Sequence, residues 1–157
     1  GRCDDISEAE SYLLESIDQD PSYIIPQFDL VIIYIRLGQL DDARDQLARA
    51  KRNVKMSRPG WVFDPISSKI ELEFAFAEKR WEEAVSLCEN QISGYQFVGL
   101  RWEWARRLID LGDALIGRND PGDLEQARET YQQSLDMYTG MGAPGYIRVL
   151  EERLSNL

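Results

Sequence analysis

The chain has 157 residues, of which 43% are hydrophobic and 29% are charged, and its formal net charge is −10. This acidic surplus disfavours nucleic acid and anionic membranes as partners, because phosphate binding needs clustered Lys and Arg. The chain has no histidine, the usual general base and zinc ligand, and it has no Gly-rich phosphate loop, so we expect no enzyme, no cofactor and no metal.

Helical periodicity runs through the whole chain, so we expect an all-α fold of about eight helices. Turn residues such as Pro21, Gly38 and Gly122 separate the periodic segments. No apolar run reaches the roughly 18 residues that a membrane span needs, and two cysteines make no disulfide framework, so a cytoplasmic location is the expectation. The expected helices cover about residues 6–17, 26–37, 40–54, 64–78, 81–93, 100–116, 124–138 and 144–154, with a loop at 56–63 and a linker at 94–99.

Four alanines share one local pattern: Ala9, Ala43, Ala84 and Ala127. A large apolar residue stands three positions before each, and a side chain suited to a core stands four positions after it. These offsets place all three positions on one helix face, where the small alanine lets a neighbouring helix approach closely. The alanines are separated by 34, 41 and 43 residues, and periods in this range are typical of solenoids built from helical hairpins.

The second hairpin, which consists of the expected helices 26–37 and 40–54, has its apolar and small residues at the spacings of a known repeat signature. The residues on the signature positions are Leu30, Val31, Tyr34, Gly38, Leu40, Ala43, Leu47 and Ala50. The chain therefore resembles a tetratricopeptide-repeat (TPR) protein, and its longer units resemble the arrays of large bacterial signalling and regulatory proteins. The third hairpin matches only through Trp81 and Ala84, which leaves its register open.

The resemblance implies antiparallel helical hairpins stacked into one right-handed superhelix over residues 1–157. Its parts would be a half repeat at 1–20, repeats at 22–55, 59–94 and 97–140, and a capping helix at 143–157. The helix near 6–17 carries the second-helix pattern without a first helix before it, and the chain begins with Gly1. We expect a piece of a longer array whose first helix leaves its apolar face partly exposed; the alternative is an N-terminal capping helix.

The resemblance also implies that the first helix of each hairpin lines a concave groove. Counting from the signature alanines places these residues in it: Ile25, Phe28, Ile32, Ile35, Arg36, Ile66, Lys69, Glu73, Phe76, Ala77, Arg106, Ile109, Asp113, Ile116 and Gly117. An apolar groove with a few charges suits an amphipathic helix or an extended peptide. The alternative is that several of these side chains are ordinary core.

Three further groups have two interpretations each. Trp61, Phe97, Trp102 and Trp104 are either interface anchors or core filling. Arg101, Arg106 and Arg107 either receive a partner carboxylate or form an intrahelical pair with Asp110 and otherwise meet water. Cys88 takes a packing position, where we expect a buried and inert thiol, whereas Cys3 is expected to be exposed.

The sequence as a whole predicts a non-catalytic module that binds a protein or peptide, basic or amphipathic, within a larger cytoplasmic signalling or regulatory protein. A second hypothesis is a spacer or self-association module that uses helix 6–17 or the C-terminal cap. A third is a small-molecule sensor.

Overall fold

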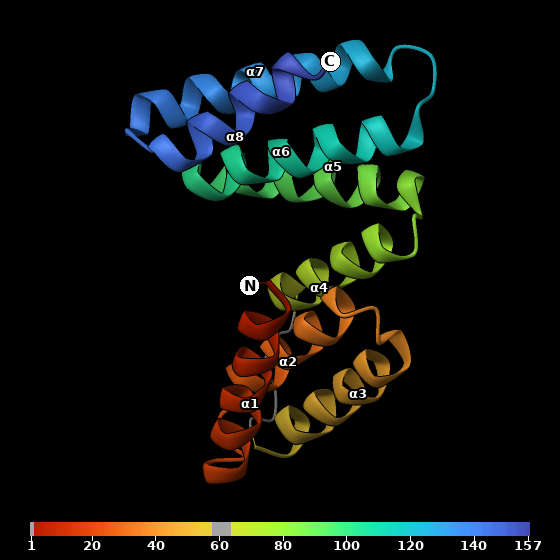
Figure 1. Cartoon of the computed structure of the whole chain (residues 1–157), viewed down its shortest axis with the longest axis vertical. Coiled ribbons are helices and arrows are strands. Elements are labelled where there is room, and N and C mark those ends of the chain that lie inside the picture. Colours follow the sequence, from red (N-terminus) through yellow and green to blue (C-terminus); the bar gives the residue numbers. More distant parts are fainter. Residues whose placement is uncertain (1, 58–63) are drawn as a thin grey trace. The chain divides into compact units, whose positions relative to one another are not determined.

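The computed structural model describes residues 2–57 and 64–157, and every regular element among them is an α-helix (Figure 1). The prediction of an all-α fold with about eight helices is confirmed. Trp61 and Phe63 lie outside the described residues, whereas Met56 and Ser57, which were expected in the same loop, are helical. The helices are α1 (Arg2–Gln19), α2 (Ile24–Arg36), α3 (Leu40–Ser57), α4 (Asp64–Ala77), α5 (Trp81–Val98), α6 (Arg101–Arg118), α7 (Asp123–Met141) and α8 (Pro144–Ser155).

The chain divides into two compact units, Gly1–Ala77 and Glu78–Leu157, and each is described by itself. The first unit holds α1 to α4 and the second holds α5 to α8. The expected repeat 59–94 takes α4 from the first unit and α5 from the second. Its pairing, and the division of residues 1–157 into repeats, therefore stay predictions.

Helix α2 is the centre of the first unit, because α1, α3 and α4 all pack against it. Its sequence is apolar on nearly every side, as a helix surrounded by other helices requires. Val31 is completely buried, and Leu30 and Phe28 are nearly so. The helix begins at Ile24, two residues before the expected start at Pro26. Proline is tolerated there because the backbone N–H groups of a first turn have no intrahelical acceptor.

The signature alanine of α1 is less buried than those of the other helices that carry the pattern. Ala43, Ala84 and Ala127 are completely buried, as a close helix contact requires. Ala9 and the Leu13 side chain four residues later are only half-buried. The apolar face of α1 is therefore covered in part, as the sequence led us to expect.

Helix α6 is the centre of the second unit: it packs against α5 and α7, while α8 packs against α7. Two glycines in α6 make close contacts with aromatic rings of the neighbouring helices. A Cβ atom on Gly112 would lie 2.4 Å from the Tyr131 ring, and one on Gly117 would lie 2.6 Å from the Trp81 ring. Any larger residue at either position would displace an aromatic side chain: Tyr131, which is almost completely buried, or Trp81, which is half-buried.

Helix α5 is longer than the sequence indicated, since it continues through Gly94 to Val98, where we expected a linker. It ends at Gly99, which takes the left-handed conformation (φ 76°), and the N–H of Leu100 donates to the carbonyl of Tyr95 at 2.9 Å. On the extended part Tyr95 is half-buried, and residues 96–98 are exposed. The low helix propensity of a single glycine is thus not enough to end the helix, and the left-handed Gly99 ends it instead.

Candidate functional site

A groove lies between α2 and α4 in the first unit, with a volume of about 200 Å³. We call it the α2–α4 groove. It is lined by Ile25, Phe28, Asp29, Ile32, Ile66, Lys69 and Ile70. These side chains meet because they follow one another at three- and four-residue steps along one face of each helix. The groove therefore brings together five of the residues counted from the signature alanines, namely Ile25, Phe28, Ile32, Ile66 and Lys69.

The floor of the α2–α4 groove is core, and its rim is open. Phe28 and Ile70 are almost completely buried, at 3% and 1% exposed, and also belong to the hydrophobic core of the first unit. Ile25 is 44% exposed, which is unusual for an isoleucine beside a pocket. Both interpretations of the counted residues are thus represented: the deep ones pack the core, and Ile25 offers free apolar surface.

Charges of both signs border the groove. Asp29 on α2 and Lys69 on α4 are exposed at its lining. Further along the same two helices, Arg36 donates to Glu73 at 3.3 Å. With side chains 51% and 27% exposed, this pair contributes little stability, about 0–1 kcal/mol. The pair of Arg36 and Glu73 does connect α2 to α4, and both of its residues were predicted to lie in the groove.

The other predicted groove residues of the first unit are placed separately. Ile35 is buried in the core, and Phe76 is half-buried near the end of α4. Two residues that line the groove were not predicted, Asp29 and Ile70. Asp29 stands four residues after Ile25 on the same helix face, so the helical spacing contained the signal. The repeat pattern does not include the position of Asp29, so this residue was not predicted.

Three of the five predicted residues of the second unit, Arg106, Ile109 and Asp113, lie on one face of α6, and two of them contact α8. Arg106 donates from Nη1 to the Tyr146 hydroxyl at 3.3 Å. The Asp113 carboxylate accepts from Arg153 at 2.7 Å and 2.9 Å, and from the Tyr131 hydroxyl at 2.5 Å. Ile109 is buried. Helix α8 is thus bonded to two of the side chains that the sequence assigned to partner binding, Arg106 and Asp113.

Ionisation in this network follows from its hydrogen bonds. The bond to Asp113 raises the pKa of Arg153, and burial, together with the Asp113 carboxylate, raises the pKa of Tyr131. Arg153 therefore stays charged, and Tyr131 stays protonated and keeps donating. Asp113 has its two oxygens occupied within the chain, which is the bonding of a structural residue. Whether it or Arg106 contacts a partner stays a prediction.

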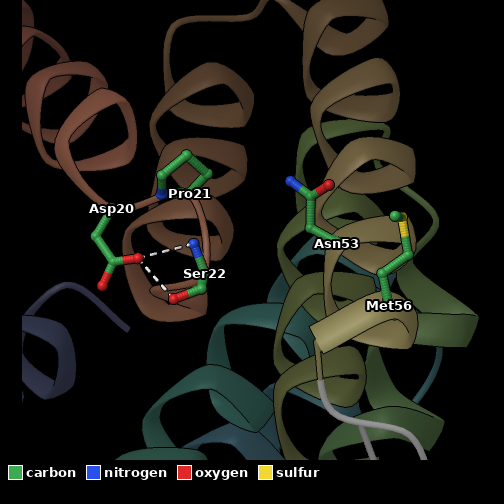
Figure 2. Close-up of a pocket in the computed structure, with 5 residues that line it drawn as sticks. All are labelled: Asp20, Pro21, Ser22, Asn53 and Met56. Atoms are coloured by element: carbon green, nitrogen blue, oxygen red, sulfur yellow. Dashed lines mark hydrogen bonds between the residues drawn. The ribbon is translucent and has the colours of Figure 1, made fainter.

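A second pocket of about 350 Å³ lies beside the turn between α1 and α2, and Figure 2 shows its lining. Asp20 accepts the backbone N–H of Ser22 at 3.0 Å and its hydroxyl at 2.6 Å. These bonds lower the pKa of Asp20. From α3, Asn53 donates to the buried side chain of Gln27, and Met56 is 83% exposed. These hydrogen bonds of Asp20, Ser22 and Asn53 are all made within the chain, so we interpret the residues that line this pocket as ones that stabilise the turn.

The aromatic and basic groups of the second unit are also placed. Phe97 is 92% exposed, Trp102 is 43% exposed, and Trp104 is half-buried with its indole N–H buried and without an acceptor among the described residues. Arg107, not Arg106, pairs with Asp110, at 2.5 Å. The intrahelical interpretation of the basic cluster therefore has the better support.

Cys88 is completely buried, and burial raises the pKa of its thiol to about 12. The side chain of Cys3 lies outside the described residues. Among the described residues, no group of three or more His, Cys, Asp or Glu side chains is placed to hold a metal ion. No described helix combines the length and the apolarity that crossing a membrane would take.

No family model, no curated protein and no solved structure matches this chain.

Proposed function

We propose that the chain is a non-catalytic, tetratricopeptide-like module that binds a peptide or a protein helix in the α2–α4 groove. The supporting observation is the groove itself: an opening of about 200 Å³ with an apolar floor, an exposed Ile25 at its edge and two charges on its rim. This volume is below the range of about 300–1,000 Å³ that is usual for small-molecule sites. It suits one or two apolar side chains of a longer ligand.

The rest of the proposal extends the repeat resemblance. Hairpins that continue the stacking of α2 and α3 would form a right-handed superhelix with this groove on its concave side. The net charge of −10 would raise the local concentration of a basic or amphipathic ligand. A free and buried Cys88 agrees with a reducing compartment, and we place the protein in the cytoplasm as part of the same proposal.

The test uses two fluorescein-labelled amphipathic helical peptides, one built of Leu and Lys and the other of Leu and Glu. We expect the Leu/Lys peptide to bind in fluorescence anisotropy and the Leu/Glu peptide to bind at least ten-fold more weakly. Ile25→Asn should weaken binding about five-fold or more, because it removes the exposed apolar edge of the groove. The fold should survive this change, since Ile25 is 44% exposed.

The matched control is Tyr23→Asn, a change of similar chemistry at a residue that is 50% exposed and stands just before α2, outside the groove lining. It should leave the affinity within about two-fold. Equal weakening by the two variants would assign the binding to general stickiness, and no binding of either peptide by the folded protein would reject the proposal.

A further inference from the structure

One end of the second unit is formed by four helix ends that meet there: the C-termini of α5 and α7 and the N-termini of α6 and α8 (Figure 1). Ring contacts hold it together. Trp102 meets Tyr138 edge-on at 5.0 Å and Tyr146 at 5.5 Å, and the Tyr138 and Tyr146 rings stack at 4.3 Å. The Tyr138 hydroxyl also donates to the carbonyl of Trp102 at 3.3 Å.

The two turns at this end carry no charge, whereas Arg101, Glu103 and Arg106 stand beside them in the first turns of α6. The segments that form its two turns, residues 90–100 and 137–147, contain no Asp, Glu, Lys or Arg, although 29% of the chain is charged. The first charges beyond these segments are Glu89, Arg101, Asp136 and Arg148. We call this surface the charge-free end. The chain as a whole is acidic, and such a charge keeps copies of a protein apart in solution, so this uncharged surface is an exception.

The charge-free end also exposes large apolar side chains. Phe97 is 92% exposed, Val98 61% and Leu100 46%, and Trp102, which borders this end between the exposed Arg101 and Glu103, is 43% exposed. Together these four side chains present on the order of 400–500 Å² of apolar surface. Exposed apolar patches of this size on monomeric proteins often mark interaction sites.

Glycines give a second and independent observation. The left-handed backbone explains Gly99 and Gly142, and ring contacts explain Gly112 and Gly117. The three remaining helical glycines are Gly94, Gly140 and Gly145. None has a positive φ, and a Cβ atom on any of them would meet nothing within 4 Å.

These three glycines all belong to the helix ends that form the charge-free end. Glycine inside a helix costs stability relative to alanine, and packing within this chain does not explain a helical glycine that has open space around it. Open helical glycines are useful where a second backbone approaches closely.

We propose that the charge-free end is a self-association surface, on which a second copy of this chain docks end to end about a two-fold axis. In such a contact the same patch serves both copies. Two chains of charge −10 repel each other, and the charge-free end lets them meet through two segments that carry no charge, with Arg101 and Glu103 at the border. A lipid surface would use the apolar side chains, but it would have no use for the missing Cβ atoms.

The exposed area sets the strength of the contact. A standard interface buries about 800 Å² per partner, and the four apolar side chains supply about half of that. The glycine-rich backbone around them would supply the rest. We therefore expect a weak monomer–dimer equilibrium with a dissociation constant on the order of 0.1 mM.

Sedimentation equilibrium on the 157-residue chain, at 0.05 M and 0.5 M NaCl, tests this proposal. The dimer should be favoured at the higher salt concentration, because screening weakens the repulsion between the acidic copies. Phe97→Asp should weaken association at least ten-fold. Gly140→Ala should weaken it about three-fold while raising the melting temperature by about 2–4 °C, since alanine is the better helix former.

The matched control is Leu124→Asp, which makes the same kind of change at a residue that is 53% exposed in the first turn of α7, at the opposite end of that helix. It should leave association within about two-fold. A protein that stays monomeric to about 1 mM at both salt concentrations would overturn the proposal, as would a Phe97→Asp variant that dimerises like the original. A monomer that sediments with phosphatidylcholine vesicles in a Phe97-dependent way would assign the end to lipid and equally overturn it.

Discussion

The contact between Arg153 and Asp113 is the main polar connection between α8 and α6, and removing it should loosen the packing of α8. Arg153→Ala abolishes the hydrogen bonds at 2.7 Å and 2.9 Å. A fully exposed ion pair contributes about 0–1 kcal/mol, and a buried hydrogen bond to a charged group about 1.5–3 kcal/mol. Because the two side chains are 35% and 30% exposed, we expect a loss between these limits, about 1–2 kcal/mol.

A double-mutant cycle with Asp113→Asn separates the pairwise contact from the other effects of each substitution. Unfolding in urea should be followed by tryptophan fluorescence, because Trp81, Trp102 and Trp104 all belong to the second unit. The expected coupling energy is about 1 kcal/mol. Since Tyr131 still donates to residue 113 in the Arg153→Ala variant, the carboxylate is not left without a partner, and the loss should not exceed this range.

The control cycle uses Arg128 and Glu125, an exposed pair on α7 whose closest atoms are 4.0 Å apart and whose side chains are 49% and 75% exposed. Its coupling energy should be near zero. A coupling of Arg153 with Asp113 below about 0.3 kcal/mol, no larger than the control, would refute the argument that partial burial and two-point geometry strengthen this pair.

Two further predictions concern the second unit. Gly117→Ala should destabilise it by about 1–3 kcal/mol despite the better helix propensity of alanine, because the new Cβ would lie 2.6 Å from the Trp81 ring; unchanged urea unfolding and unchanged Trp fluorescence would contradict this. The hydrogen bond from Arg118 lowers the pKa of Asp123, so this carboxylate contributes stability above the ordinary aspartate pKa of about 4, and the contribution is lost as the pH falls through the lowered value. Asp123→Asn should therefore lower the melting temperature at pH 7 and make little difference at pH 2; a difference that is constant with pH would exclude this linkage.

The helices could be predicted from the sequence because their signals are local. The pattern around Ala43 or Ala127 depends on residues within one turn on either side, and both alanines are completely buried as expected. The groove residues Ile25 and Phe28 followed from the same count. Helix α5 was predicted too short, because the low helix propensity of Gly94 suggested the end of the helix there, whereas the left-handed Gly99 ends it.

Contacts between distant helices could not be predicted in this way. Arg153 and Asp113 are 40 residues apart, and their meeting depends on how α8 is turned about its axis against α6. Arg106 has the spacing for an i,i+4 pair with Asp110, yet Arg107 takes that partner and Arg106 reaches Tyr146 on α8. Helical spacing predicts which face of its helix a residue occupies. The position of the neighbouring helix determines which atoms that residue contacts.

The repeat resemblance makes α2 and α6 equivalent helices, but the predicted groove faces of the two helices have different neighbours. On α2 the face leaves a groove of about 200 Å³ with Ile25 at its edge. On α6 it is engaged by α8, through Tyr146 on Arg106 and Arg153 on Asp113. Recognition by the proposed module should therefore concentrate in the first unit. Loosening α8 by Arg153→Ala should then leave the affinity for the Leu/Lys peptide unchanged, whereas Ile25→Asn lowers it. If Arg153→Ala raised the affinity instead, α8 would be covering a second binding surface on α6.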